Sequence, residues 1–178
     1  MLLIPAHTAP YKADGASDGA PNGSDPGPQQ RLRMCELAVA GEDGLDVSAV
    51  EIERGGLSYT VDTVTALHAS ENVELTLIVG ADTACTLAGW REPQRLLELA
   101  ALAVAARAGA ARQRVLDALA GIDAAARVSF LEMPAVAVSS SLVRQRVAAG
   151  EDVEPLVGPA VARYIAEHRL YEGAAAGR

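Results

Sequence analysis

Short apolar runs alternate with segments of helical periodicity along most of the chain. Residues 75–79, 102–106 and 128–131 form runs of strand length that are almost entirely apolar. Between them, apolar residues recur at helical spacing in segments 96–99 and 115–119. Strands that alternate with helices predict an α/β fold with a mostly parallel sheet.

The two ends of the chain extend this pattern, with one long interruption. Further predicted elements are a strand end at 2–5, a helix at 31–40, a strand at 45–52, and helices after residue 60, at 142–149 and at 159–171. Residues 13–30 contain only Ala, Asp, Gly, Ser, Pro, Asn and Gln, which predicts a mobile loop. We therefore expect one domain over residues 1–171 and a disordered tail at 172–178.

Composition and charge narrow the classes of function. Half of the 178 residues are apolar and the net charge is −8, which argues against a nucleic-acid partner. No run of 18 apolar residues and no signal-peptide pattern is present, so we expect a cytoplasmic protein without a membrane partner. The two cysteines and three histidines are scattered, and no metal ligands are assigned. Monomer and oligomer both stay open.

Gly80 and Asp82 directly follow the strongest predicted strand. A glycine there lets a ligand approach the backbone, and the carboxylate can accept hydrogen bonds from ribose hydroxyls or an amide. The alternative is that Asp82 only caps a helix that starts at Thr83.

Ser139, Ser140 and Ser141 precede a predicted helix whose first turn contains Arg144. A cation is unfavourable at this end of the helix dipole, and a bound phosphate would resolve the conflict. The alternative is that two solvated arginines, Arg144 and Arg146, pair with Glu151 or Asp152.

Tyr59, Thr60, Trp90 and Lys12 are further candidates. Ser58-Tyr59-Thr60 offers hydroxyls and a stacking face, and the single tryptophan would stack on an electron-poor pyridine ring. Lys12 could reach a phosphate as a point charge. A core tyrosine, a half-buried core tryptophan and a solvated loop lysine are the alternatives.

The order and spacing of these groups resemble those of the nicotinate-nucleotide adenylyltransferases, over residues 2–171. The most specific match is the segment 54–63, which reads Arg-Gly-Gly-Leu-Ser-Tyr-Thr-Val-Asp-Thr. It is followed in the family's order by Gly-Ala-Asp at 80–82, by Trp90, and by Ser-Ser-Ser-Leu-Val-Arg at 139–144.

The resemblance implies a Rossmann-like sheet and an enzyme of NAD biosynthesis. It would transfer adenylyl from ATP to nicotinate mononucleotide, with Mg²⁺, and release pyrophosphate and nicotinate adenine dinucleotide. The residues that the resemblance implies for binding the mononucleotide and lying beside the nucleotides are Tyr59, Thr60, Gly80, Asp82 and Trp90. Those that it implies for the ATP phosphates are Lys12, Ser140, Ser141 and Arg144.

Two departures from the family pattern carry expectations of their own. Ser141 stands where this family usually has threonine, and the serine version is frequent in pantetheine-phosphate adenylyltransferase, a relative in the same superfamily. The family's first strand and its Gly-x-Phe-x-Pro-x-His-x-Gly-His loop are absent from the 178 residues. No catalytic residue is therefore assigned.

The missing strand is central in the sheet order 3-2-1-4-5. We therefore expect a divided sheet with exposed edges, and a native protein that is longer by a strand, a loop and a helix. The alternatives are a non-catalytic nucleotide-binding remnant of the family and a pantetheine-phosphate adenylyltransferase.

Overall fold

The structure is a computed structural model that describes residues 1–10, 26–71, 73–106, 110–122, 127–134 and 136–172. The chain divides into two compact units. The terminal unit comprises Met1–Ser58 and Ala137–Arg178, and the central unit comprises Tyr59–Val136. The single domain expected over residues 1–171 stays a prediction.

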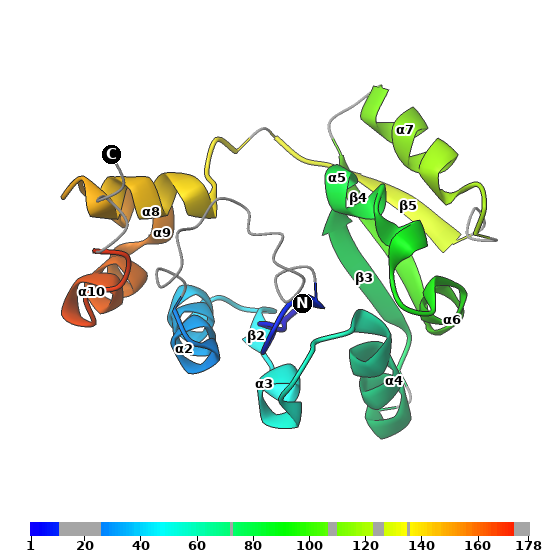
Figure 1. Ribbon diagram of the computed structural model, residues 1–178, viewed down its shortest axis with the longest axis horizontal. Helices are drawn as coiled ribbons and strands as arrows, with labels where there is room; N and C mark the ends of the chain where they lie inside the picture. Colours follow the sequence, from blue (N-terminus) through cyan, green and yellow to red (C-terminus); the bar gives the residue numbers. More distant parts are fainter. Residues whose placement is uncertain (11–25, 72, 107–109, 123–126, 135, 173–178) are drawn as a thin grey trace. The chain divides into compact units, whose positions relative to one another are not determined.

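The central unit contains a parallel sheet of β3 (Leu75–Gly80), β4 (Ala100–Ala106) and β5 (Val128–Glu132), in that order (Figure 1). Its helical elements are α4 (Thr60–Glu71), α5 (Ala81–Ala84), the short 3-10 helix η1 (Leu87–Gly89), α6 (Pro93–Leu99) and α7 (Ala110–Leu119). All three strands were predicted from their apolar runs, and the predictions are confirmed.

One face of this sheet forms the core of the central unit. Leu102 and Val104 of β4 are fully buried, together with Leu96 of α6 and Val115 of α7. Because side chains alternate along a strand, the opposite face carries the other half of each strand. There Ile78 is 45% exposed, although parallel sheets are usually covered on both faces.

The terminal unit combines two short strands with several helices. Its elements are β1 (Leu2–Leu3), α2 (Pro28–Val39), β2 (Asp46–Val47), α3 (Val50–Arg54), α8 (Ser140–Ala148), α9 (Glu154–Val157) and α10 (Pro159–Glu167). Val161 and Ile165, four residues apart on α10, are buried in a second core with Val143 of α8. That spacing places both side chains on one helix face.

The described strands form two separate parallel sheets rather than one. β1 pairs with β2 in the terminal unit, whereas β3, β4 and β5 form the sheet of the central unit. This confirms the expected division of the sheet.

Several element boundaries differ from the sequence-based predictions, and α8, for example, begins at Ser140 rather than at Leu142. Only Asp46–Val47 of the strand predicted at 45–52 is extended, because the Ser48 hydroxyl accepts a hydrogen bond from the Val50 N–H and a helix follows. Helix α2 begins at Pro28, inside the loop predicted at 13–30, and residues 13–25 lie outside the described residues. Helix α10 ends at Glu167, and only turns continue to residue 172.

Candidate active site

The predicted substrate segment begins with two glycines that shape the approach to α4. Gly55 and Gly56 both have a φ of 70°, in the left-handed region that glycine adopts without strain. Ser58 is buried, and its hydroxyl accepts a hydrogen bond from the His7 backbone N–H at 2.9 Å. Ser58 therefore links the segment at His7 to the end of the terminal unit, and α4 begins two residues later at Thr60.

Tyr59 opens the central unit beside the first turn of α4. Its backbone carbonyl accepts hydrogen bonds from the N–H groups of Asp62 and Thr63 at 3.1 and 3.3 Å. The ring is half-buried and packs against the core of the central unit. Thr60, the first residue of α4, is also half-buried. The core alternative for Tyr59 thus holds for part of the ring.

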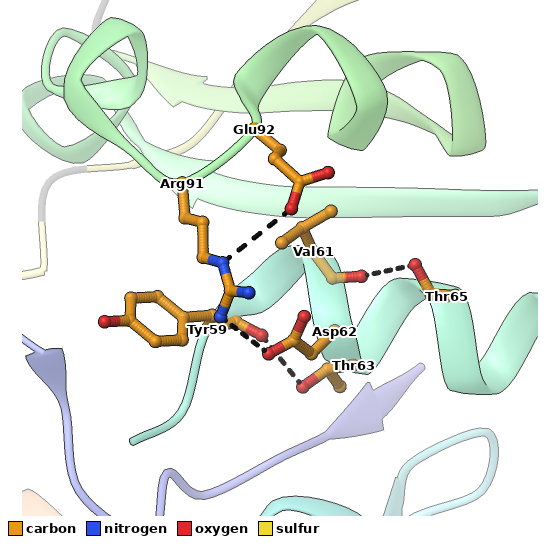
Figure 2. Close-up of polar contacts among 7 residues, drawn as sticks. All are labelled: Tyr59, Val61, Asp62, Thr63, Thr65, Arg91 and Glu92. Atoms are coloured by element: carbon orange, nitrogen blue, oxygen red, sulfur yellow. Dashed lines mark hydrogen bonds and ion pairs between the residues drawn. The ribbon is translucent and has the colours of Figure 1, made fainter.

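Arg91 is a member of this site that the sequence reasoning missed. Its guanidinium carbon lies 4.7 Å from the centroid of the Tyr59 ring, a cation–π geometry. Arg91 Nη1 is 3.4 Å from Asp62 Oδ2, and Nε is 3.7 Å from Glu92 Oε1 (Figure 2). The sequence contained a signal for Arg91, because an arginine directly after Trp90 places a cation beside a residue that was predicted to bind the pyridine ring.

Glu92 adopts a left-handed backbone conformation with a φ of 48°. It is the residue before Pro93, the first residue of α6, and proline disfavours the right-handed helical region at that position. Figure 2 shows its carboxylate directed toward the Nε of Arg91. The turn between Trp90 and α6 thus brings a carboxylate and a guanidinium together.

Trp90 follows η1 and is half-buried against the same core cluster as Tyr59. Its indole N–H donates a hydrogen bond to Thr86 Oγ1 at 3.0 Å, and its backbone N–H donates to the Leu87 carbonyl. The side chain is held at its polar edge, while part of the ring is open to solvent. This agrees with the half-buried alternative and leaves ring surface for a ligand.

Gly80 and Asp82 lie where β3 ends and α5 begins. Gly80 is exposed and is the N-cap residue of α5. The Asp82 side chain is 95% exposed, and its Oδ1 is 3.3 Å from Arg114 Nη2 of α7. Helix α5 begins at Ala81, so Asp82 is inside the helix rather than its cap. The carboxyl end of a parallel strand is where open α/β sheets bind ligands.

The serine segment lies in the terminal unit. The Ser139 hydroxyl accepts a hydrogen bond from the Leu142 N–H at 3.1 Å and caps α8, as predicted. Ser140 and Ser141 are exposed in the first turn. Arg144 Nη2 lies 3.4 Å from Ser140 Oγ, so Arg144 reaches back toward the amino end of the helix.

The acidic residues after α8 pair with a different arginine. Arg146 Nε is 3.7 Å from Glu151 Oε2, and Arg146 Nη1 donates to the Asp152 carbonyl at 3.4 Å. The solvated-pair alternative therefore fits Arg146. Arg144 instead contacts Ser140 of its own helix.

The predicted site residues fall into two sets. Those that lie in the central unit are Tyr59, Thr60, Gly80, Asp82 and Trp90. Those that lie in the terminal unit are Ser140, Ser141 and Arg144. Lys12 lies outside the described residues.

A shallow cavity of about 280 Å³ borders the Arg91 cluster within the central unit. It lies between α4 and the start of α6 and is lined by Val61, Asp62, Thr65, Glu92 and Arg95. Two of these lining residues, Asp62 and Glu92, carry the carboxylates that approach Arg91.

Metal ligation and membrane insertion leave no signature in the part of the chain that the structure describes. It contains no group of three or more His, Cys, Asp or Glu residues that could hold a metal ion. None of its helices has the length and apolar character needed to span a membrane.

Comparison with known proteins places this arrangement in a family. The model of the cytidylyltransferase-like family matches residues 28–146. A probable nicotinate-nucleotide adenylyltransferase of Bordetella avium is 40% identical over 147 residues, which cover 82% of this chain and 74% of that protein. The chain belongs to the nicotinate-nucleotide adenylyltransferase family.

Other members of the nicotinate-nucleotide adenylyltransferase family match at similar levels. A probable nicotinate-nucleotide adenylyltransferase of Roseiflexus sp. is 40% identical over 173 residues, which cover 96% of this chain and 82% of that protein. The Plasmodium falciparum nicotinic acid mononucleotide adenylyltransferase, solved in complexes with APC and with NaAD, matches with a TM-score of 0.61 and 18% identity. That match covers 81% of this chain and 75% of the APC-complexed chain, and it shows the shared Rossmann-like fold. The family resemblance seen in the sequence is thus confirmed.

Proposed function

We propose that this chain transfers adenylyl from ATP to nicotinate mononucleotide, as the names of its relatives indicate. A phosphate oxygen of the mononucleotide attacks the α-phosphorus of ATP and forms a new P–O–P bond. The bond between the α- and β-phosphates breaks, and pyrophosphate leaves. The products are nicotinate adenine dinucleotide and pyrophosphate. A cytoplasmic location, where ATP is abundant, fits this reaction.

The observation that carries the proposal is the set of ligand-type groups in the central unit. Tyr59 and Trp90 present half-buried rings on one core cluster, and Gly80 and Asp82 lie at the carboxyl end of β3. In this proposal Tyr59, Thr60 and Trp90 bind the mononucleotide. Gly80 and Asp82 lie beside the nucleotides, where the carboxylate accepts from ribose hydroxyls.

The ATP phosphates are assigned to groups of the terminal unit. Ser140 and Ser141 expose hydroxyls in the first turn of α8, where backbone N–H groups and the helix dipole attract anions. The Arg144 guanidinium, already directed toward Ser140, adds a fixed positive charge. Lys12 keeps its predicted role as a second phosphate contact.

A reaction of this kind depends on positioning and charge neutralisation rather than on a covalent nucleophile. Mg²⁺ supplies neutralisation of the phosphate charge when it is bound to ATP. Proteins commonly hold Mg²⁺ through one or two carboxylates and the phosphates of the substrate. The described residues contain no group of three metal-ligating side chains, and this is compatible with a cation that arrives with ATP.

The test is an acceptor assay with the purified chain, ATP and Mg²⁺. Product masses and pyrophosphate release are measured with nicotinate mononucleotide, nicotinamide mononucleotide and phosphopantetheine. We expect nicotinate adenine dinucleotide as the main product. Turnover of phosphopantetheine alone would contradict the acceptor assignment, and nucleotide binding without turnover would favour a non-catalytic remnant.

A matched pair of variants tests the assignment of the phosphate contacts. Arg144→Gln should raise the KM for ATP by roughly tenfold or more, because a charge-assisted phosphate contact is lost. Arg146→Gln is the control, since Arg146 is engaged with Glu151 and the Asp152 carbonyl. Equal effects in the two variants would contradict a specific role for Arg144.

A further inference from the structure

We propose that Arg91 selects the acceptor by charge, with its guanidinium binding the ring carboxylate of nicotinate mononucleotide. This would favour the acid over the corresponding amide. The inference rests on the proposed function, because that function supplies the acceptor. It concerns a side chain that the sequence reasoning did not assign, at the residue directly after Trp90.

The position of Arg91 is defined by three neighbours within the central unit. The guanidinium lies over the Tyr59 ring at 4.7 Å, with Asp62 on one side and Glu92 on the other (Figure 2). Tyr59 and Trp90 are proposed to contact the mononucleotide. Arg91 lies over the Tyr59 ring and directly follows Trp90 in the sequence. A cation is thus held where the pyridine ring is expected.

The existing contacts of Arg91 leave donors available for a ligand. The contacts to Asp62 and Glu92 are long, at 3.4 and 3.7 Å, and the Arg91 side chain is 50% exposed. Guanidinium carries five N–H donors in a planar fork. Within the described residues, Arg91 donates a hydrogen bond from Nη1 to Asp62, and its Nη2 donates none. A carboxylate could therefore form a charge-assisted, bidentate contact without the existing partners being displaced.

The two neighbouring carboxylates determine how the loss of Arg91 should affect each ligand. Asp62 and Glu92 are 39% and 49% exposed, and both also line the adjacent cavity. With Arg91 removed, they would repel an anionic ring substituent, whereas a neutral amide would be little affected. Loss of Arg91 should therefore abolish or reverse the preference for the acid, rather than weaken both ligands alike.

If the role of Arg91 is purely structural, a different effect of its removal on the two ligands is expected. If the guanidinium only supports the Tyr59 ring, its removal should lower the affinity for the acid and the amide by the same factor. The ratio of the two affinities, rather than either affinity alone, separates the two roles.

Isothermal titration calorimetry of the full chain measures this ratio directly. Nicotinate mononucleotide and nicotinamide mononucleotide are each titrated into the wild type, Arg91→Gln, Arg91→Lys and Arg95→Gln. Arg95 is the matched control, because it lines the same cavity as Asp62 and Glu92 and its loss changes the net charge equally. Far-UV circular dichroism and thermal midpoints verify that each variant is folded.

We expect the wild type to bind the acid at least about tenfold more tightly than the amide. Arg91→Gln should bring the ratio to one or below, Arg91→Lys should give an intermediate ratio, and Arg95→Gln should keep the wild-type ratio. An unchanged ratio in Arg91→Gln, or an equal loss in Arg95→Gln, would overturn the inference. A wild type that binds both ligands equally, or prefers the amide, would overturn it while leaving the adenylyl-transfer proposal intact. A wild type that binds neither ligand would overturn the acceptor assignment as well.

Discussion

The hydroxyl of Ser58 accepts a hydrogen bond from the backbone N–H of His7 at 2.9 Å, across 51 residues of sequence. The return contact runs between backbones, from the Ser58 N–H to the Thr8 carbonyl at 2.9 Å. Ser58 is 7% exposed. The segment that follows β1 is thereby fastened to the segment that leads into α4.

Replacement of Ser58 by alanine should destabilise the protein by about 1–3 kcal/mol, because the His7 N–H loses its partner in a partly buried setting. Urea denaturation followed by far-UV circular dichroism measures the loss. Ser48→Ala is the control, since the Ser48 hydroxyl accepts a local hydrogen bond from the Val50 N–H at 3.3 Å. A loss in Ser58→Ala no larger than in the control would contradict this account.

Replacement of Arg31 by lysine should destabilise the protein by about 2 kcal/mol. The Arg31 guanidinium donates to three backbone carbonyls, at 2.5 Å to Ala6, 2.9 Å to His7 and 2.7 Å to Pro26. An ammonium group cannot reproduce this planar fork. Chemical denaturation is the measurement.

The control for Arg31 lies two residues away on the same helix. Arg33 is 55% exposed and pairs with Glu36 at 2.8 Å, so Arg33→Lys should change stability by less than about 0.5 kcal/mol. If the two substitutions cost the same, the three carbonyl contacts of Arg31 contribute little.

Replacement of Ser139 by alanine should destabilise α8 and cost about 1 kcal/mol, because the Leu142 N–H loses its cap. Ser141→Ala removes an exposed hydroxyl from the first turn of the same helix and should stay within about 0.5 kcal/mol. Thermal unfolding of the two variants side by side measures the difference. A reversed order would show that Ser139 does not act as the cap.

Alkylation of Cys35 should be slow near neutral pH. Burial raises the pKa of this thiol above its ordinary value of 9.0, with the Arg31 charge acting in the opposite direction and the Glu36 charge adding to the rise. Iodoacetamide rates in a Cys85→Ser background, measured against pH, should give an apparent pKa above 9.0. A midpoint below that value would contradict the prediction.

The same shift links stability to pH. Above pH 9.0 the unfolded thiol ionises first, so the unfolded state binds fewer protons than the folded state. The stabilising contribution is complete below the unfolded pKa and is lost as the pH rises through the folded pKa. A Cys35→Ser variant should lack this part of the alkaline loss of stability.

The elements that could be predicted are those with an unambiguous local pattern. The apolar runs of β3 and β4 can only be buried strands or buried helices, and their length and flanking glycine favour strands. Ser139 was recognisable as a cap because a polar hydroxyl directly precedes a helical pattern. The strand predicted at 45–52 was too long, since Val50–Ile52 fits a helix face equally well and packing decides between them.

Candidate site residues could be predicted only where the functional group of a single residue and its place in the sequence indicated a ligand. Tyr59 and Asp82 stood out because a hydroxyl and a carboxylate lie at the start of a predicted helix or the end of a predicted strand, and Trp90 stood out as the single tryptophan. The contact between Arg91 and Tyr59 was not predictable, because it joins residues 32 positions apart through the packing of α4 and α6. Pairwise tertiary contacts of this kind leave no periodic signal in a single sequence.

Trp90 is the only tryptophan of the chain and lies in the central unit, with its indole N–H bonded to Thr86. Its fluorescence emission therefore reports on the unfolding of Tyr59–Val136 alone, whereas far-UV circular dichroism averages over both units. Denaturation curves that coincide for the two signals would mean that the units melt as one cooperative body. Curves that separate would show that each unit unfolds with its own midpoint. Trp90 is thus a built-in fluorescent probe that distinguishes the unfolding of the central unit from that of the whole chain.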